Sequence, residues 1–291
     1  MKKLTTFEAH EGQAPDLLFT PDGRTLISAG MDNVVKTWSV GDWQTTATLR
    51  GHEKSVNALD VSPDGDTLVT GSSDSTVKLW SLSTGEVFHT LRDRKQTVSA
   101  VAFSSDGEWL ASGWYGGRAV VWTLDGDEVI GIKASRKNLS SVAISPDREA
   151  LATAGLGGEI TIWELPSGAP RQTLSGHETA VSSLHFIGEG KQLVSLGYEG
   201  TIRLWSTDTW EPERLIPLED APARRFVLSP DGETGALSFE GRVQIWDTAI
   251  WEPLEELTVG TKAVGGMAFS PDRAWFAAGA ADGKIRVWGM A

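Results

Sequence analysis

The sequence predicts an all-β fold built from seven similar units. A Trp recurs every 41 or 42 residues, at Trp38, Trp80, Trp122, Trp163, Trp205, Trp246 and Trp288. Before these Trp residues apolar and polar side chains alternate, as in TVKLW at 76–80, which is the period of a half-buried strand. No stretch shows the 3.6-residue apolar period of a helix longer than one turn.

Four short strand-like runs make up one unit, and they are clearest between residues 56 and 91. Turn-forming Pro-Asp-Gly, Ser-Asp-Ser and Ser-Thr-Gly segments separate them: VNALDVS (56–62), TLVTGS (67–72), TVKLW (76–80) and VFHTL (87–91). Four strands in about 42 residues are typical of one blade of a propeller. We therefore expect a seven-bladed β-propeller with four antiparallel strands per blade, in a single domain over residues 1–291.

The two ends of the chain are expected to meet in one blade. Only three residues follow Trp288, so the last unit lacks a fourth strand. The segment LTTFEAHEG at 4–12 matches TATLRGHEK at 46–54, which contains the fourth strand of the first unit. Residues 2–8 should therefore supply the fourth strand of the blade formed by about residues 263–290, close the ring and remove its unpaired edges.

The repeat resembles that of the WD-repeat β-propeller family. The resemblance covers essentially the whole chain and is carried by Gly-His pairs at 51–52 and 176–177 and by the Trp that ends each third strand. The Trp-Asp pair itself is intact only at 246–247. The resemblance implies a non-catalytic scaffold that presents a preorganised surface to a peptide or protein partner. It also implies that the loops joining fourth to first strands and second to third strands form the narrow top face.

The resemblance further implies hydrogen-bonded networks inside three blades, in which a His joins a turn carboxylate to a strand hydroxyl that also meets the Trp. Carried over by position, these networks are His10–Ser28–Asp32–Trp38, His52–Thr70–Asp74–Trp80 and His177–Ser195–Glu199–Trp205. A buried polar group without a partner costs roughly 1–3 kcal/mol. We therefore expect these His residues to stabilise the blades rather than to bind a metal or act in catalysis.

Residues that depart from the repeat without serving the fold are candidates for partner binding. Trp114 is bulky where the other six units have Gly, Ser or Ala, and cations gather in the nearby loops at 91–96 and 132–138. Aromatic residues and Arg are enriched at binding hot spots. The candidates on the top face are Trp114, Tyr115, Arg94, Lys95, Arg118, Arg136, Lys137, Tyr198, Arg224 and Phe239. They favour an acidic or phosphorylated partner. Alternatively, Trp114 fills the space of a missing His and the cations are ordinary solvated charges.

Composition narrows the remaining functions. A formal charge of −13 disfavours binding to nucleic acid or anionic membranes. The chain has no Cys and no apolar leader segment, so we expect a cytoplasmic protein without disulfides, and a monomer on its own.

No motif indicates a nucleophile, cofactor or metal site. The channel mouth is expected to be rich in Ser, Asn and Gly, with Arg224 as its only charged group. Such residues do not favour acid–base catalysis, which needs a positioned proton donor or acceptor. An enzyme or small-ligand binder using the central channel is the alternative.

Overall fold

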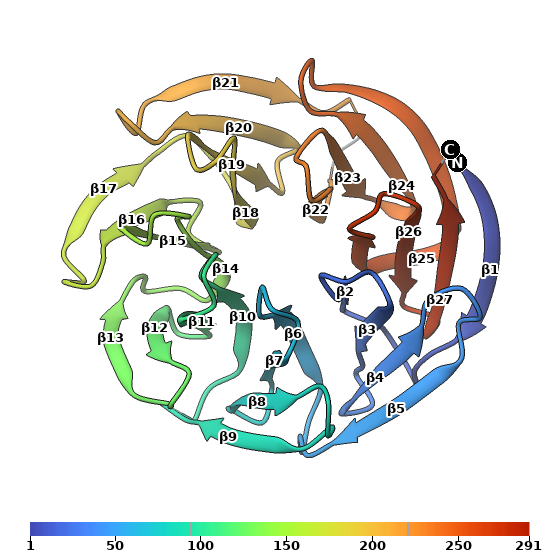
Figure 1. Cartoon of the computed structure of the whole chain (residues 1–291). Helices are drawn as coiled ribbons and strands as arrows, with labels where there is room; N and C mark the ends of the chain where they lie inside the picture. Colours follow the sequence, from blue (N-terminus) through green and yellow to red (C-terminus); the bar gives the residue numbers. More distant parts are fainter. Residues whose placement is uncertain (94, 220–221, 291) are drawn as a thin grey trace.

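Every regular element of the structure is a β-strand. The computed structural model describes residues 1–93, 95–219 and 222–290, and in these residues it contains strands, turns and bends but no helix. The strands form antiparallel sheets arranged around a central axis (Figure 1). The all-β prediction is therefore confirmed for the described part of the chain, in which no segment is a helix able to span a bilayer.

Five sheets each contain four antiparallel strands in chain order, and each sheet corresponds to one repeat of the sequence. The first repeat forms β2 (Asp16–Phe19), β3 (Thr25–Ala29), β4 (Val34–Ser39) and β5 (Thr45–Arg50). The second forms β6 (Val56–Val61), β7 (Thr67–Ser72), β8 (Val77–Ser81) and β9 (Val87–Leu91). The third forms β10 (Val98–Phe103), β11 (Trp109–Trp114), β12 (Arg118–Thr123) and β13 (Glu128–Lys133). The fourth forms β14 (Leu139–Ile144), β15 (Ala150–Gly155), β16 (Ile160–Glu164) and β17 (Pro170–Leu174). The fifth forms β18 (Val181–Ile187), β19 (Gln192–Gly197), β20 (Thr201–Ser206) and β21 (Pro212–Pro217).

The sixth and seventh repeats share one seven-stranded sheet in the order β1-β27-β26-β25-β24-β23-β22. Its first half along the chain is β22 (Arg225–Leu228), β23 (Thr234–Ser238) and β24 (Glu240–Asp247), and its second half is β26 (Trp275–Ala280) and β27 (Lys284–Gly289). The 18-residue β25 (Glu252–Phe269) joins them, because its early residues pair with β24 and its last residues with β26. No Pro, Asn or Asp interrupts residues 254–264, and β-branched side chains there favour extended backbone. Separate four-stranded sheets were expected for these repeats.

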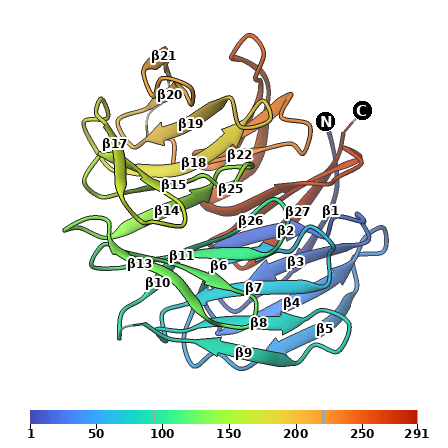
Figure 2. The same ribbon diagram turned by 60° about the vertical axis from the view of Figure 1, so that its left-hand side comes forward.

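The first strand of the chain, β1 (Lys2–Glu8), pairs antiparallel with β27, and the two termini lie side by side (Figures 1 and 2). Phe7 is opposite Ile285, and Glu8 is opposite Lys284, with which it forms an ion pair of 2.7 Å. The backbone of Ala9 continues the contact through a hydrogen bond to the carbonyl of Gly283. Residues 2–8 therefore lie beside the strand that contains Trp288, as the sequence predicts.

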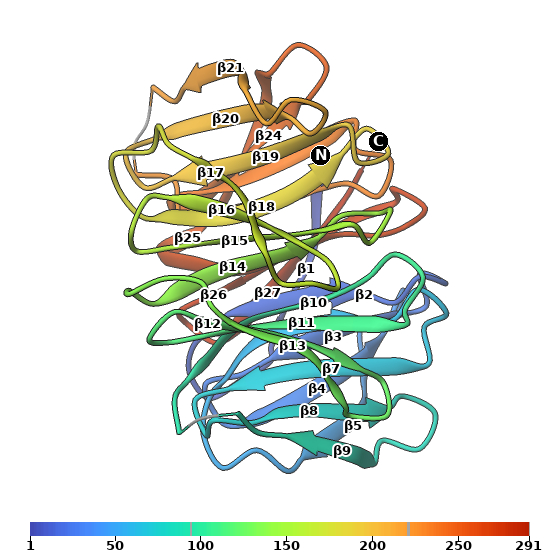
Figure 3. The ribbon, with the colours of Figure 1, turned by 90° about the vertical axis from the view of Figure 1, so that its left-hand side faces the viewer.

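Apolar cores lie between the sheets of neighbouring repeats, which face one another as Figure 3 shows for β10–β13 and β14–β17. Between the first and second repeats, for example, Ile27 packs with Leu68 and Trp80. A comparable core joins the last repeat to the first, where Ala277 and Ile285 pack in one cluster with Trp38. Successive side chains of a strand point to opposite faces of its sheet, so each sheet contributes apolar side chains to the core on either side of it.

Candidate functional site

The network expected in the second repeat is present, with all four residues in hydrogen-bonding contact. His52 Nδ1 lies 2.8 Å from Asp74 Oδ2, and His52 Nε2 lies 2.6 Å from Thr70 Oγ1. Trp80 donates its indole N–H to Thr70 Oγ1 at 2.9 Å. Hydrogen bonds lower the pKa of Asp74 although its partial burial acts in the opposite direction. The network ties the loop before β6 to β7, to β8 and to the turn between them.

The first repeat has the same arrangement. His10 Nδ1 lies 2.9 Å from Asp32 Oδ1, and His10 Nε2 lies 2.7 Å from the hydroxyl of Ser28, which also accepts the indole N–H of Trp38 at 3.0 Å. Burial lowers the pKa of the His10 imidazole in spite of the neighbouring Asp32. A neutral ring fits this geometry, because its Nδ1–H donates to the carboxylate while its Nε2 accepts from the hydroxyl.

In the fifth repeat a Glu replaces the turn Asp without breaking the network. His177 Nδ1 contacts Glu199 Oε1, and its Nε2 lies 2.7 Å from the Ser195 hydroxyl, to which Trp205 donates at 2.9 Å. Burial alone would raise the pKa of Glu199, but hydrogen bonds from Thr179 and other neighbours lower it to about 2. The longer side chain therefore remains an ionised acceptor. Each of these three imidazoles has both ring nitrogens engaged within its own sheet.

Trp114 is buried inside the third repeat and is not part of an exposed surface. Its side chain is fully inaccessible, and its indole N–H donates to the Ser112 hydroxyl at 3.0 Å. The repeat Trp122 donates to the same oxygen at 2.9 Å. In the other networks a His ring meets this strand hydroxyl, so the indole of Trp114 takes the place of the imidazole that the third repeat lacks. The expectation that Trp114 contacts a partner is wrong, and the packing alternative is correct.

Two other predicted contact residues are also engaged within the protein. Arg118 lies in β12, where its guanidinium forms ion pairs with Asp93 at 2.6 Å and with Glu128 at 3.3 Å and is largely shielded from solvent. Phe239 is only 3% exposed, and the guanidinium of Arg242 lies 5.0 Å from its ring centroid. The assignment of Phe239 to the binding surface is therefore wrong, because neighbouring residues cover its ring, whereas Arg118 is partly exposed and engaged in ion pairs. Arg94 lies outside the described residues.

Three of the predicted residues that remain exposed, Tyr115, Tyr198 and Arg224, line the central cavity. Tyr115 and Tyr198 have exposed rings and line the mouth of the central cavity, and Leu156 stands between them on the intervening repeat. These three residues occupy the same position of the third, fifth and fourth repeats, directly before the turn of the second hairpin. Leu156 is not among the residues predicted from the sequence. Its repeat position, which it shares with Tyr115 and Tyr198, is the sequence feature that could have identified it. We call the mouth surface these three residues together with the exposed cations Lys95, Arg136, Lys137 and Arg224.

Backbone hydrogen bonds hold the mouth surface in place. Tyr115 N–H donates to the carbonyl of Thr97, Leu156 N–H to Asn138, and Tyr198 N–H to Ala180, at 2.8–3.0 Å. Each bond joins a hairpin turn to the loop that leads into the first strand of the same repeat. The Lys137 ammonium also lies 3.5 Å from the Leu156 carbonyl, which places a cation beside the apolar side chains. The three apolar groups are thus presented by backbone that is already ordered.

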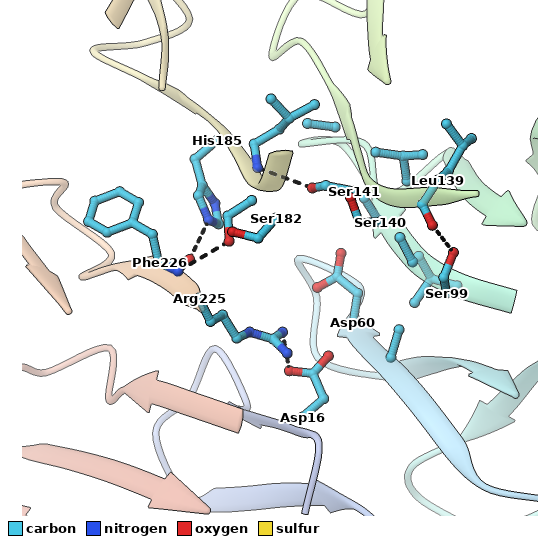
Figure 4. A pocket seen from close by; sticks show the side chains of 18 of the residues that line it. Asp16, Asp60, Ser99, Leu139, Ser140, Ser141, Ser182, His185, Arg225 and Phe226 are labelled. Carbon is cyan, nitrogen blue, oxygen red and sulfur yellow. Dashed lines mark hydrogen bonds and ion pairs between the residues drawn. The ribbon is translucent and has the colours of Figure 1, made fainter. Parts of the chain in front are cut away.

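A central cavity of about 710 Å³ continues inward from the mouth surface and is lined mainly by the first strands of the first six repeats (Figure 4). Its lining includes Asp16, Asp60, Arg225 and His185 in addition to Arg224. The expectation named Arg224 as the only charged group of the channel mouth, and below the mouth the cavity contains these further ionisable groups. The additional groups lie inside the first strands rather than in the loops, on the side that each strand turns to the axis.

The charged groups of the cavity differ in how they are compensated. Arg225 reaches Asp16 across the seventh repeat, with 2.5 Å between Nη2 and Oδ1, and donates to the carbonyl of Pro15. Burial raises the pKa of Asp16, although Arg225 acts in the opposite direction. Asp60 accepts hydrogen bonds from the backbone N–H of Val61 at 2.8 Å and of Phe103 at 2.7 Å. Burial raises the pKa of Asp60 to about 6.

The polar groups of the cavity are occupied by bonds between repeats rather than arranged as a nucleophile with its base. Ser99 donates to the Leu139 carbonyl at 2.7 Å, and Ser140 donates to the Val181 carbonyl. His185 Nε2 lies 2.8 Å from the Phe226 carbonyl, and burial lowers the pKa of this ring. Within the described ranges, no three His, Cys, Asp or Glu side chains are grouped to hold a metal ion. In the part of the chain that the structure describes, the Ser99 and Ser140 hydroxyls are thus engaged with backbone carbonyls.

Comparison with known protein families agrees with this architecture. The family model described as "IFT122 first beta-propeller" matches residues 13–223, which is more than half of the chain, and the model described as "WD domain, G-beta repeat" matches residues 251–289. The chain belongs to the WD-repeat β-propeller family. The human protein WD repeat-containing protein 36 is 49% identical over 39 residues, which are 13% of this chain and 4% of that protein. The match thus covers a small part of that relative's length.

WD-repeat propellers are typically protein-interaction scaffolds and are generally non-catalytic. In this WD-repeat chain the His networks occur in the first, second and fifth repeats, and Trp114 substitutes for the His in the third. The surface on which Tyr115 and Tyr198 are exposed is formed by the third to fifth repeats. Of these three repeats, the fifth contains a His network, whereas the third and fourth do not.

Proposed function

We propose that this WD-repeat chain is a closed seven-bladed propeller that acts as a non-catalytic scaffold and binds an acidic segment of a protein partner at the mouth surface. The single observation that carries the proposal is the exposure of Tyr115, Leu156 and Tyr198 on three consecutive repeats, beside cations and on rigid backbone. Exposed apolar groups that are clustered and rimmed by polar residues mark interaction sites.

A ring of seven blades is supported by the packing between repeats. Each of the seven Trp-containing repeats shares an apolar core with the next, and the last shares one with the first. In this proposal β25 serves two blades, as the outer strand of the sixth and the inner strand of the seventh. The pairing of β1 with β27 then supplies the fourth strand of the seventh blade.

The charge of the mouth surface supports an acidic partner. The whole chain carries a formal charge of −13, yet the loops around the three apolar residues contribute the exposed cations Lys95, Arg136, Lys137 and Arg224. Such local complementarity accelerates encounter with an acidic segment and disfavours basic ones. Phosphate groups would meet the same cations, and Lys and Arg both bind phosphate well. The proposal therefore includes a phosphorylated segment as a variant of the acidic one.

A binding experiment with synthetic peptides tests the proposal. Fluorescence anisotropy would compare a labelled Glu- and Leu-containing peptide, its phosphoserine version and a Lys-substituted version. We expect the acidic peptides to bind and the basic one to fail, with affinity falling as salt is added. The double change Tyr115→Ala with Tyr198→Ala should weaken binding by at least about tenfold, as for hot-spot aromatic residues. Met31→Ala is the matched control, because Met31 is exposed at the same repeat position on the first repeat. Equal losses in both proteins would contradict the proposal.

The proposal also places the protein in the cytoplasm as a monomer on its own. The absence of Cys agrees with a reducing compartment, and the net negative charge opposes self-association. Sedimentation at several concentrations tests the monomer, and imaging of a tagged chain in its host tests the compartment.

A further inference from the structure

Two carboxylates and the cations Arg224 and Arg225 line the central cavity, and in the described part of the chain one carboxylate has no cation in contact with it. Asp16 is compensated by Arg225, which contacts it directly. Asp60 lies on the adjacent inner strand β6, and in the part of the chain that the structure describes its side chain accepts only two backbone N–H groups. The nearness of Asp16 further disfavours its charge. The cavity therefore contains an anion that is anchored but not neutralised.

The geometry of Asp60 leaves acceptor capacity directed into the cavity. An ionised carboxylate has about four lone-pair sites, and the two backbone hydrogen bonds use one site on each oxygen. Figure 4 shows the carboxylate projecting into the cavity from β6, opposite the sheets that carry Ser140 and Ser182. The bonds from Val61 and Phe103 fix its orientation, because the two donors come from two different strands.

Hydroxyl and imidazole groups of the cavity offer further acceptors, while Arg224 and Arg225 line it as donors. Ser99 and Ser140 give their hydroxyl hydrogens to backbone carbonyls, which leaves oxygen lone pairs for a ligand. His185 donates from Nε2 to the Phe226 carbonyl, so its neutral ring has an acceptor at Nδ1. A ligand that complements these atoms must be rich in N–H donors and positively charged.

A carboxylate is not the common residue at this place, although here it also accepts the backbone N–H of Phe103 on the next repeat. The corresponding residues of the other repeats are mostly apolar, and three of the six are Ala: Leu18, Ala102, Ala143, His185, Val227 and Ala268. Burying a charge without a partner is unfavourable. Ser141 and Ser183 accept backbone N–H groups of the next repeat without carrying a charge, so the bond to Phe103 does not by itself explain an ionisable group at Asp60.

We propose that the central cavity binds a small organic cation, a primary amine or guanidinium compound, with its charged group at Asp60. The cavity volume lies within the range of known small-molecule sites, about 300–1,000 Å³, and an ion pair gains strength where water is partly excluded. A lysine or arginine side chain of a peptide carries the same chemistry, and the experiment separates the two sources. This inference does not depend on the proposed partner at the mouth surface.

Isothermal titration calorimetry with putrescine and agmatine tests the proposal on the full chain. Both should bind the wild type, and Asp60→Ala should reduce affinity by at least about tenfold, since a hydrogen-bonded charge pair is lost. Asp66→Ala is the matched control, because it removes an exposed carboxylate from the same repeat and should leave affinity unchanged. Failure of both amines to bind at millimolar concentration, or equal binding by the Asp60 variant, would overturn the inference.

A second measurement keeps the test independent of the variant's folding. Carboxyl carbon NMR of wild-type protein would follow the titration of Asp60, which shares the cavity with Asp16, His185, Arg224 and Arg225. A bound cation favours the ionised carboxylate, so saturating agmatine should lower the pKa of Asp60 and its affinity should fall below about pH 6. An unchanged titration would overturn the inference. A blocked Gly-Gly-Arg-Gly-Gly peptide that competes with agmatine would assign the source to a side chain, and failure to compete would assign it to a free amine.

Discussion

Trp114 donates its indole N–H to the hydroxyl of Ser112 at 3.0 Å, in the position where three other repeats bring a His ring to the strand hydroxyl. The bond explains why a residue that departs so strongly from the repeat is buried. A blade without its His has a space beside the strand hydroxyl, and the indole from a neighbouring strand position fills this space and donates to the hydroxyl.

Replacing Trp114 by Ala should therefore destabilise the protein by about 3–5 kcal/mol, which is typical of a truncated buried aromatic side chain. Tyr115→Ala should change stability by less than about 1 kcal/mol, because the Tyr115 side chain is exposed. Urea unfolding measures both. A stable Trp114→Ala protein would show that the indole does not replace the imidazole.

Removing His52 should break a complete network. We expect His52→Ala to lower the free energy of unfolding by about 2–4 kcal/mol, because Thr70 and Asp74 each lose a buried partner. His89→Ala is the control, since His89 lies on the outer strand β9 outside the networks, and its effect should be below about 1 kcal/mol.

The networks also predict how stability depends on pH. Burial lowers the pKa of His10, His52 and His177 below that of the unfolded chain, about 6.5. The three His residues therefore contribute fully to the free energy of unfolding above pH 6.5. This contribution is lost as the pH falls towards their lower pKa values in the folded state. The decrease in melting temperature between pH 7 and pH 5 should be smaller in His52→Ala than in the wild type. An identical decrease would show that folding does not change the pKa of His52.

Protonation of Asp60 should raise the stability of the folded protein as the pH falls, which is opposite to the effect of the His residues. Its folded pKa of about 6 lies above the ordinary value near 3.9, so the folded state takes up a proton first as the pH falls. The stability of wild type relative to Asp60→Ala should be lowest at pH 8 and should rise by up to about 3 kcal/mol towards pH 4. Chemical denaturation of both proteins across this range measures the difference, in which the contributions of other groups largely cancel. A flat difference would mean that Asp60 has an ordinary pKa.

The contact between the last and first repeats depends on Gly266. A Cβ at this position would lie 2.4 Å from Leu17 N and 2.6 Å from Asp16 Cα, and these are backbone atoms that cannot move aside easily. Gly266→Ala should therefore destabilise the protein by about 1–3 kcal/mol, as overpacking does. Gly232→Ala meets no atom within 4 Å but has a φ of +73°, so it serves as a control for backbone strain alone.

Deleting residues 1–9 should leave β27 with an unpaired edge. Such edges promote association between sheets, so the truncated chain should aggregate and melt at a lower temperature. Light scattering during thermal unfolding measures both effects. A truncated protein that stays monomeric with unchanged stability would refute the role of β1.

Much of the architecture could be predicted from the sequence because local spacing decides it. The recurring Trp and the alternation before it specify strands, and the fixed offsets of His52, Thr70, Asp74 and Trp80 specify a network within one sheet. The pairing of residues 2–8 with the last repeat also follows from a short segment that matches another copy of itself. In each case the interacting residues belong to one repeat or to equivalent positions in two repeats. Aligning the repeats of the chain with one another is therefore enough to identify them.

Only the tertiary structure decided which of the candidate residues are accessible. Trp114 and Phe239 were expected on the surface and are buried, whereas Tyr115 and Tyr198 are exposed at their hairpins. Accessibility depends on which side chains of adjacent sheets and loops cover a residue, and that is not encoded in its own repeat. The same holds for the cavity, where Arg225 and Asp16 meet across 209 positions of sequence. The sequence by itself determined the repeat and its internal bonds, and packing around the axis decided the charges that face the cavity.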